Sequence, residues 1–272
     1  MRYATGKHPY QAKASDLLMA KYLDKSALIN SGQVPEAPSM YFLPQPDGAL
    51  PMWDGDDLGN KTIGLCVFAG LAHLFMLAGK LSGQPCTITK DQVVALYAQL
   101  TGYDPVTGAN DNGYNIRDLL AYAQTTGAWG RKVLAYTLVN AQDPVELAIA
   151  TWLGCGTLGG FSLPLTAEGQ TAPDGRQLWD VPQGGFTAAN GPGTWGGHCI
   201  HCYSTSTDRD GGNSWGERSF WTRAWQQACQ DEAWLILPDN WAPSTGLAPD
   251  GFALADLLAD VAARNAASTT PP

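Results

Sequence analysis

The chain has 272 residues, a length that suits one large domain or two closely packed lobes. Its formal net charge is −9, its sequence pI is about 4.7, and no cluster of Lys and Arg occurs along it. This charge pattern excludes a basic surface for nucleic acid or an anionic membrane. An apolar fraction of 44% is enough for a sizeable core.

Residues 1–57 are expected to form an extended lead-in with a short helix, predicted at 14–23. A run rich in Pro and Gly follows from Val34 to Gly59, and we expect it to drape over the domain with Met52 and Trp53 as anchors. The first eight residues contain no apolar signal core, so the sequence gives no indication of secretion.

The stretch from Gly64 to Ala78 is apolar on nearly every face, which predicts a helix enclosed by protein. It is too short, and too interrupted by Gly and His, to span a membrane. Cys66 lies in its first turn, where the helix dipole favours a thiolate and lowers the pKa of a thiol. Cys66 is therefore a candidate nucleophile, and the alternative is a small core residue.

The elements that follow change from helical to extended. Thr89 and Gln92 form a predicted capping box for a helix through Leu100, and a third helix is predicted over 115–125. Strands are predicted from Lys132 onward, with one short helix opened by Asp143 and Pro144. This order predicts an α+β protein with a helical lobe at 58–130 and a β lobe at 131–240. Residues 241–272 are expected to form a C-terminal amphipathic helix and a tail.

The six cysteines are interpreted as mostly reduced thiols, because nothing in the sequence indicates secretion. The segment from His198 to Cys202 looks like a metal motif, but alternate residues of a strand face opposite sides. His198 would then point away from Cys199 and His201, so four ligands for zinc cannot come from this segment alone. No metal and no cofactor are predicted.

Cys66, His198 and Asn213 together point to thiol chemistry. Attack of a thiol on an amide needs a thiolate, a base or ion-pair partner, and a group that orients the imidazole. The three residues supply these types, at the separation of roughly 130 to 150 residues expected of such a set. Asn60, shortly before Cys66, offers a side-chain amide to an oxyanion, with the Cys66 backbone N–H as the second donor.

The same residues carry a resemblance to the papain-like cysteine peptidases, over about Leu58 to Leu237. Cys66–Ala69 resembles their Cys-Trp-Ala-Phe helix start, Gly196–His198 resembles their Gly-Gly-His strand, and Asn213–Gly216 matches their Asn-Ser-Trp-Gly motif. The resemblance implies a papain-like fold, in which a helical lobe with the central Cys helix packs against an antiparallel β-barrel-like lobe.

The resemblance also implies roles for four residues: Cys66 as nucleophile, His198 as its partner, Asn213 as orienter and Asn60 as oxyanion donor. Asn60 stands where the family usually has Gln. Trp215 is expected to shield the contact between Asn213 and His198 from water.

A second resemblance is to little-characterised papain-like proteins of tailed bacteriophages and prophages. It implies a protein of the bacterial host cytoplasm or of the virion, with phage virion proteins as possible partners. The matching pieces are Leu58-Gly59-Asn60, Asp111-Asn112-Gly113, Trp179-Asp180-Val181, Gly197-His198, Ser214-Trp215-Gly216, Asp231-Glu232-Ala233 and Pro249-Asp250-Gly251-Phe252-Ala253-Leu254.

The predicted function is a cysteine peptidase that cleaves a peptide or protein substrate through a Cys66 thioester, with His198 as acid and base. The main alternative is a virion or capsid-associated structural or binding protein that keeps the fold with little or no activity. A third hypothesis keeps the thiol chemistry and changes the substrate to cell-wall peptide or an isopeptide.

Overall fold

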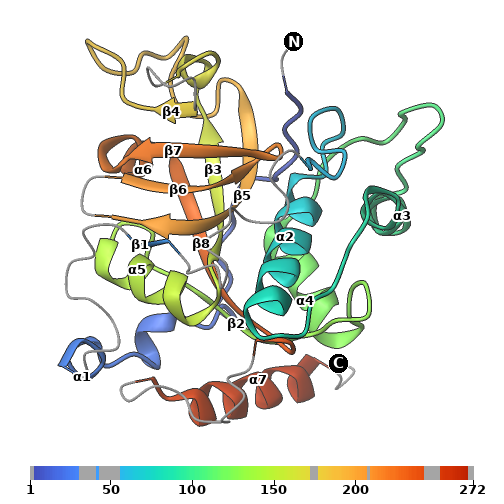
Figure 1. The fold of residues 1–272 in the computed structure, drawn as a ribbon, viewed down its shortest axis with the longest axis vertical. Coiled ribbons are helices and arrows are strands. Elements are labelled where there is room, and N and C mark those ends of the chain that lie inside the picture. Colours follow the sequence, from blue (N-terminus) through green and yellow to red (C-terminus); the bar gives the residue numbers. More distant parts are fainter. Residues whose placement is uncertain are drawn as a thin grey trace.

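The computed structural model describes residues 3–30, 41–42, 56–171, 177–206, 209–241 and 252–268. Three helices lie on one side of the molecule and a twisted sheet lies on the other (Figure 1). The α+β class predicted from the order of the elements is therefore confirmed. None of the described helices is long and apolar enough to cross a membrane.

The helical side consists of α2 (Cys66–Leu81), α3 (Lys90–Thr101) and α4 (Ile116–Thr125). Every residue of α2 from Cys66 to Gly79 is buried, as its all-round apolar sequence predicts. The capping box predicted for α3 is present, because Thr89 and Gln92 bond to each other's backbone N–H. Two of these helices contact the sheet: α2 lies against β3 and β5, and α4 lies against β2.

The described sheet has the strand order β2-β8-β3-β5-β6-β7-β4, with β1 added beside β5. All described pairings are antiparallel except that between β4 and β7. The sheet is open, with β2 and β4 at its two edges, so the barrel-like lobe that the resemblance implied is not a closed barrel. The strands are β1 (Tyr41–Phe42), β2 (Val133–Leu138), β3 (Thr157–Leu163), β4 (Gln177–Trp179), β5 (Gly196–Thr205), β6 (Arg209–Ser214), β7 (Glu217–Thr222) and β8 (Gln230–Pro238).

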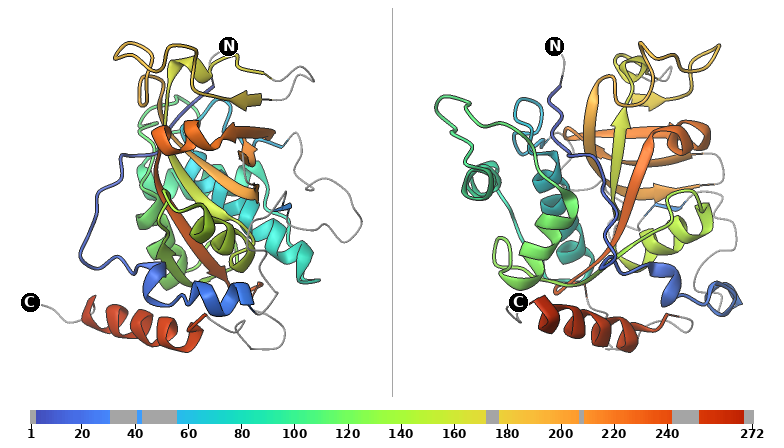
Figure 2. Two further views of the ribbon diagram at one scale, coloured as in Figure 1. Left: turned by 90° about the vertical axis from the view of Figure 1, so that its left-hand side faces the viewer. Right: turned by 180° about the vertical axis from the view of Figure 1, so that it is seen from behind.

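Short helices complete the sheet side. α5 (Pro144–Leu153) starts as predicted, with the Asp143 side chain accepting the N–H groups of Val145 and Glu146. It packs against β3, β5 and β8, and α6 (Arg223–Cys229) lies between β7 and β8. The 3-10 helix η2 (Leu165–Ala167) follows β3, and α7 (Leu254–Ser268) runs across the end of the molecule near β2 (Figure 2).

Three predictions of local structure are wrong. The helix predicted at 14–23 is reduced to the 3-10 helix η1 (Met19–Lys21), followed by the short helix α1 (Lys25–Asn30). The loop expected around Asn213 is the strand β6, and the helix expected from Phe220 begins only at Arg223, after β7. Backbone pairing with another segment overrides the local propensity in these places: Leu18 bridges Leu138, β6 pairs with β5 and β7, and β7 pairs with β6. The anchors predicted at Met52 and Trp53 lie outside the described residues.

The core between the two sides is one apolar cluster in which α2 meets the sheet. Phe68 and Phe75 of α2 belong to it, together with Leu158 of β3 and Trp234 of β8. A separate aromatic cluster lies within the sheet side. It contains Phe161, Trp179, Trp215, Trp221 and Trp225, with ring centroids 5.0–6.3 Å apart. The first cluster joins α2 to the sheet and contains Cys66, whereas Trp215, which stacks on His198, belongs to the second.

Candidate active site

Cys66 is the first residue of α2, and its side chain is completely buried. The turn that precedes it is held from two directions. The Asp57 side chain accepts the N–H of Gly59 at 2.7 Å, and the Asp111 carboxylate accepts the N–H of Gly64 at 2.9 and 3.0 Å. Asp111 also accepts the hydroxyl of Tyr97 at 2.7 Å, which ties this turn to α3. The start of the helix is thereby fixed in place.

His198 lies near the start of β5 and is also completely buried. Its Nε2 is 2.9 Å from the Ser214 hydroxyl, and its Nδ1 has no hydrogen-bond partner. The indole of Trp215 stacks on the imidazole, with ring centroids 4.2 Å apart and planes at 20°. Ser214 therefore holds the ring by one edge and Trp215 covers one face.

Asn213 is placed one residue away from the position that meets the imidazole. It pairs with His201 across the β5–β6 register, and its Oδ1 accepts the N–H of Gly216 at 2.9 Å. That bond closes the tight turn between β6 and β7, where Trp215 has a φ of 54° and Gly216 of 76°. The structure thus brings His198 to Ser214 and gives Asn213 a partner within the turn.

Asn60 is buried in the turn before α2, and its backbone N–H donates to the Asp57 carbonyl at 2.8 Å. Its Oδ1 has no hydrogen-bond partner. A buried amide with an unused acceptor is uncommon and costs stability, so its side chain is a candidate functional group. Its role as an oxyanion donor stays a prediction.

The Cys66 thiol faces the backbone N–H of Cys199 in β5, the residue after His198. Burial raises the pKa of this thiol to about 11, while the backbone N–H groups of Cys199 and Gly6 act in the opposite direction. Burial likewise lowers the pKa of His198 to about 3. The lowered thiol pKa expected from the helix start is therefore wrong for this covered state, because desolvation outweighs the dipole. Both groups are neutral here.

What covers them is the N-terminal segment (Tyr3–His8), which runs between the helical side and the sheet (Figure 2). The N–H groups of Gly6 and Lys7 donate to the Gly197 carbonyl at 3.0 and 2.9 Å, on the sheet side. On the helical side, Tyr114 donates to the Gly6 carbonyl at 2.8 Å and accepts from His8 at 3.0 Å. The segment is bonded to both walls as an extended peptide would be.

The indole N–H of Trp215 donates to the Ala4 carbonyl at 2.8 Å, which fixes the segment beside the stacked imidazole. Glycines make the close approach possible. A Cβ on Gly6 would lie 1.8 Å from the Gly64 carbonyl oxygen, and a Cβ on Gly113 would lie 1.9 Å from the Gly6 oxygen. The fit leaves no room for a second peptide while the segment is in place.

Sequence reasoning missed three residues that hold this site together: Lys7, Asp111 and Ser214. Lys7 stands in a stretch without hydrophobic periodicity, so no local signal marks it. Ser214 lies inside the recognised motif, but the neighbouring Asn213 was the predicted partner of the imidazole. The predicted cover, residues 34–59, lies mostly outside the described residues, and the described cover is the segment Tyr3–His8.

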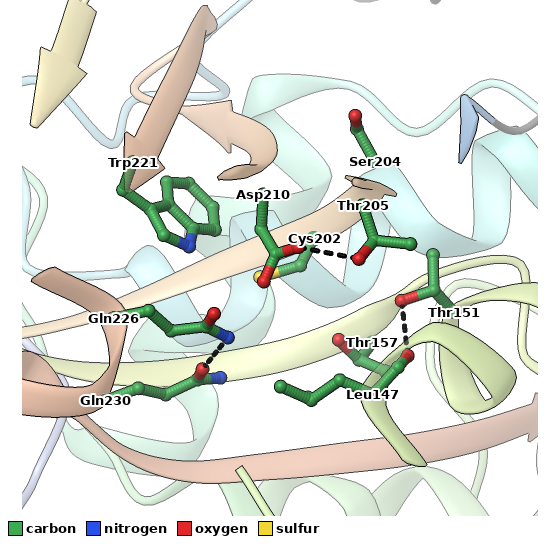
Figure 3. Close-up of a pocket in the computed structure, with 10 residues that line it drawn as sticks. All are labelled: Leu147, Thr151, Thr157, Cys202, Ser204, Thr205, Asp210, Trp221, Gln226 and Gln230. Carbon is green, nitrogen blue, oxygen red and sulfur yellow. Dashed lines mark hydrogen bonds between the residues drawn. The ribbon is translucent and has the colours of Figure 1, made fainter. Parts of the chain in front are cut away.

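A separate small pocket lies on the sheet side, and none of the four predicted site residues lines it (Figure 3). Its free volume is about that of one water molecule. Its charged group, Asp210, is already paired with Thr205 at 2.6 Å and with Arg223 at 2.6 and 3.0 Å. Over the described residues, no three His, Cys, Asp or Glu side chains are arranged to hold a metal ion.

No protein-family model and no curated protein sequence matches this chain. A solved structure that is similar is xylellain, a cysteine protease from Xylella fastidiosa, with a TM-score of 0.63 and 17% sequence identity. The match covers 87% of this chain and 96% of that one. The chain has a papain-like fold. The fold expected from the three motifs is thus confirmed, whereas the likeness to phage-encoded proteins stays a prediction.

Proposed function

We propose that this papain-like protein is a thiol hydrolase, a cysteine peptidase that cleaves amide bonds through a thioester on Cys66. The observation that carries the proposal is the position of the thiol at the first residue of α2, facing the backbone N–H of Cys199, the residue after His198. An imidazole with one nitrogen bonded to Ser214 and the other unpaired is suited to exchange a proton with that thiol.

In this mechanism the Cys66 sulfur attacks the substrate carbonyl carbon, and the thiol proton passes to His198. The negative charge that develops on the carbonyl oxygen is stabilised by the backbone N–H of Cys66 and the side-chain amide of Asn60. The C–N bond then breaks, and His198 donates its proton to the leaving amine. Water, activated by His198, hydrolyses the thioester and regenerates the thiol.

The closed structure accounts for control of this reaction. With the N-terminal segment in place, both reacting groups are buried, and their pKa values keep them neutral. Displacement of the segment hydrates the site, so the thiol pKa falls and the imidazole pKa rises toward the values of an ion pair. Catalysis therefore requires the segment to leave or to be cut.

The deciding experiment is covalent labelling of the full chain with a peptidyl vinyl sulfone, carried out on a Gly6→Ala variant in which the segment cannot seat. We expect one adduct on Cys66, located by mass spectrometry, and hydrolysis of a mixed fluorogenic peptide library. Cys66→Ala should abolish both. Cys86→Ala removes the one thiol that is not fully buried and should change neither. An unlabelled Cys66 together with no hydrolysis would overturn the proposal.

The closed cleft also favours the second candidate, a virion-associated binding or structural protein that retains the fold. Cys66 and His198 are completely buried, and a protein that does not turn over a substrate needs no access to them. If the segment-displaced variant exposes Cys66 to small alkylating agents and still hydrolyses nothing, and the chain copurifies with phage particles, this candidate replaces the first.

A further inference from the structure

Lys7 is anchored in the wall of the cleft by a pair of carboxylates. Its Nζ lies 2.8 and 2.9 Å from the Asp231 oxygens and 3.1 Å from Glu232 Oε1. The Lys7 side chain is 0% exposed and that of Glu232 is 1% exposed, whereas Asp231 remains 30% exposed. Burial alone would lower the pKa of Lys7, but Glu232 and Asp231 raise it above its ordinary value. The ammonium is therefore charged and matched by the two acids.

The space around this side chain exists because two strands carry glycine there. A Cβ on Gly160 of β3 would lie 2.8 Å from Lys7 Cδ and 2.5 Å from Glu232 Cγ. A Cβ on Gly197 of β5 would lie 2.0 Å from the Lys7 carbonyl oxygen. A side chain on Gly160 would fill the space that the Lys7 side chain occupies, and one on Gly197 would collide with the Lys7 backbone. The pocket is thus a built feature of β3, β5 and β8.

The Lys7 ammonium lies close enough to Cys66 for its charge to act on the thiol. The backbone N–H of Gly6 faces Cys66, and Lys7 is the following residue of the same extended, hydrogen-bonded segment. A peptide bound along the same walls would therefore place one side chain in the pocket within one or two residues of the bond to be cut. The segment acts as an intramolecular example of such a peptide.

We propose that Asp231 and Glu232 form a subsite for the lysine side chain of a peptide substrate, and that Lys7 is its resident occupant. The inference rests on the proposed function. Its physical basis is that a buried carboxylate without a partner is costly. Once Lys7 leaves, an ammonium restores the pairing of Glu232, whereas a neutral side chain of the same length leaves it unpaired. The subsite therefore selects a lysine side chain over a neutral side chain of the same length, because only the lysine pairs with Glu232.

The other contacts of the two acids fit this role. Glu232 Oε2 accepts the indole N–H of Trp234 at 2.6 Å, which fixes the carboxylate and leaves Oε1 to face the pocket. Asp231 Oδ2 also accepts the Ser162 hydroxyl at 3.2 Å. Both acids are therefore held in place from outside the pocket, so the subsite does not depend on Lys7 for its shape.

The test uses the full chain with Gly6→Ala, which unseats the segment, together with Lys7→Ala, which frees the pocket; Lys7→Gln replaces Lys7→Ala should the first variant fail to fold. Fluorogenic peptides that differ only in lysine against norleucine at the matching position are compared. Norleucine keeps the four-carbon chain and lacks the ammonium. We expect kcat/KM to be at least 30-fold higher for the lysine peptide. Adding Glu232→Gln and Asp231→Asn should bring the ratio close to one.

Two further measurements separate this proposal from the proposed function. A vinyl sulfone without a side chain at this position should label Cys66 equally with and without the acid substitutions. Labelling with no preference for lysine, or a preference that survives the acid substitutions, overturns the subsite and leaves the thiol chemistry standing.

If no peptide is hydrolysed, the subsite is judged by binding. Calorimetry on the Gly6→Ala, Lys7→Ala, Cys66→Ala chain, in which the segment is unseated, compares the peptide Tyr-Ala-Thr-Gly-Lys-His-Pro-Tyr with its norleucine analogue. We expect at least tenfold tighter binding of the lysine peptide. Equal binding, or none, overturns the subsite. Lys13→Ala, which removes only an exposed ion pair with Asp118, is the control and should leave the pocket occupied.

Discussion

Gly6 donates its backbone N–H to the carbonyl of Gly197 at 3.0 Å, in the residue directly before His198. The first residues of the chain therefore bond to the same strand that carries the candidate imidazole. The backbone N–H of Gly6 also faces the Cys66 thiol, and Cys66 and His198 are both 0% exposed. These contacts imply that the state of the N-terminal segment decides whether the site can react.

Replacing Gly6 by Ala should open the site. The new Cβ would lie 1.8 Å from the Gly64 carbonyl oxygen, and backbone on both sides leaves it no space. We expect the rate at which iodoacetamide alkylates Cys66 at pH 8 to rise at least tenfold. The rate is measured by mass spectrometry of the peptide that contains Cys66. Gln11→Ala, at an exposed position farther along the same stretch, is the control. An unchanged rate would show that the segment does not guard the thiol.

Ser214 should matter to the imidazole more than Asn213 does. Loss of the hydrogen bond between Ser214 and His198 Nε2 should raise the activation free energy by about 1 to 1.5 kcal/mol, because the imidazole is no longer oriented. This corresponds to a decrease in kcat/KM of about tenfold. The measurement is the pH profile of kcat/KM for Ser214→Ala and Asn213→Ala, each in the Gly6→Ala chain. The part of the pH profile that reports the titration of the His198 imidazole should shift in Ser214→Ala and not in Asn213→Ala. A shift confined to Asn213→Ala would return the orienting role to Asn213.

Acid should destabilise the protein through its buried histidines. Burial lowers the pKa of His73 to about 3, of His198 to about 3 and of His201 to about 4. In the unfolded chain the pKa of a histidine is about 6.5. Below that pH the unfolded chain binds protons that the folded chain does not bind, so the free energy of unfolding falls as the pH falls. Each histidine contributes a slope of about 1.4 kcal/mol per pH unit. Urea denaturation between pH 6 and pH 4.5 measures it.

His73→Gln isolates one of these contributions. We expect the slope of unfolding free energy against pH to decrease by about 1.4 kcal/mol per unit in this window, whatever the variant's stability at pH 7. His8→Gln, at an exposed position, should keep the full slope. A slope that is equal in all three chains would mean that His73 does not resist protonation in the folded protein.

Asp111 should be required for the turn that presents Cys66. Asp111→Ala removes the acceptor of the Gly64 N–H and of the Tyr97 hydroxyl, which should cost about 1 to 3 kcal/mol in unfolding free energy. Asp118→Ala, an exposed acid at the start of α4, is the matched control and should change stability by less than about 0.5 kcal/mol. Comparable losses in both variants would show that Asp111 contributes no more than a surface charge.

The sequence by itself determined the elements whose signals are local. All-round apolar composition predicted the buried helix α2, and side-chain caps predicted the starts of α3 and α5. Three short motifs in order indicated the papain-like fold, because each lies on an element that the fold needs. Those signals arise from neighbouring residues, so they can be read without knowledge of distant contacts.

Only the tertiary structure decided which residues meet in the site. Neighbouring residues of a strand face opposite sides, so the register of β6 on β5 selects Ser214 over Asn213 as the partner of His198. The pairing of Lys7 with Asp231 and Glu232 joins residues 224 and 225 positions apart in the sequence, and no local pattern encodes it. The pKa of Cys66 follows the same rule, because burial by distant segments outweighs the helix start on which the thiol stands.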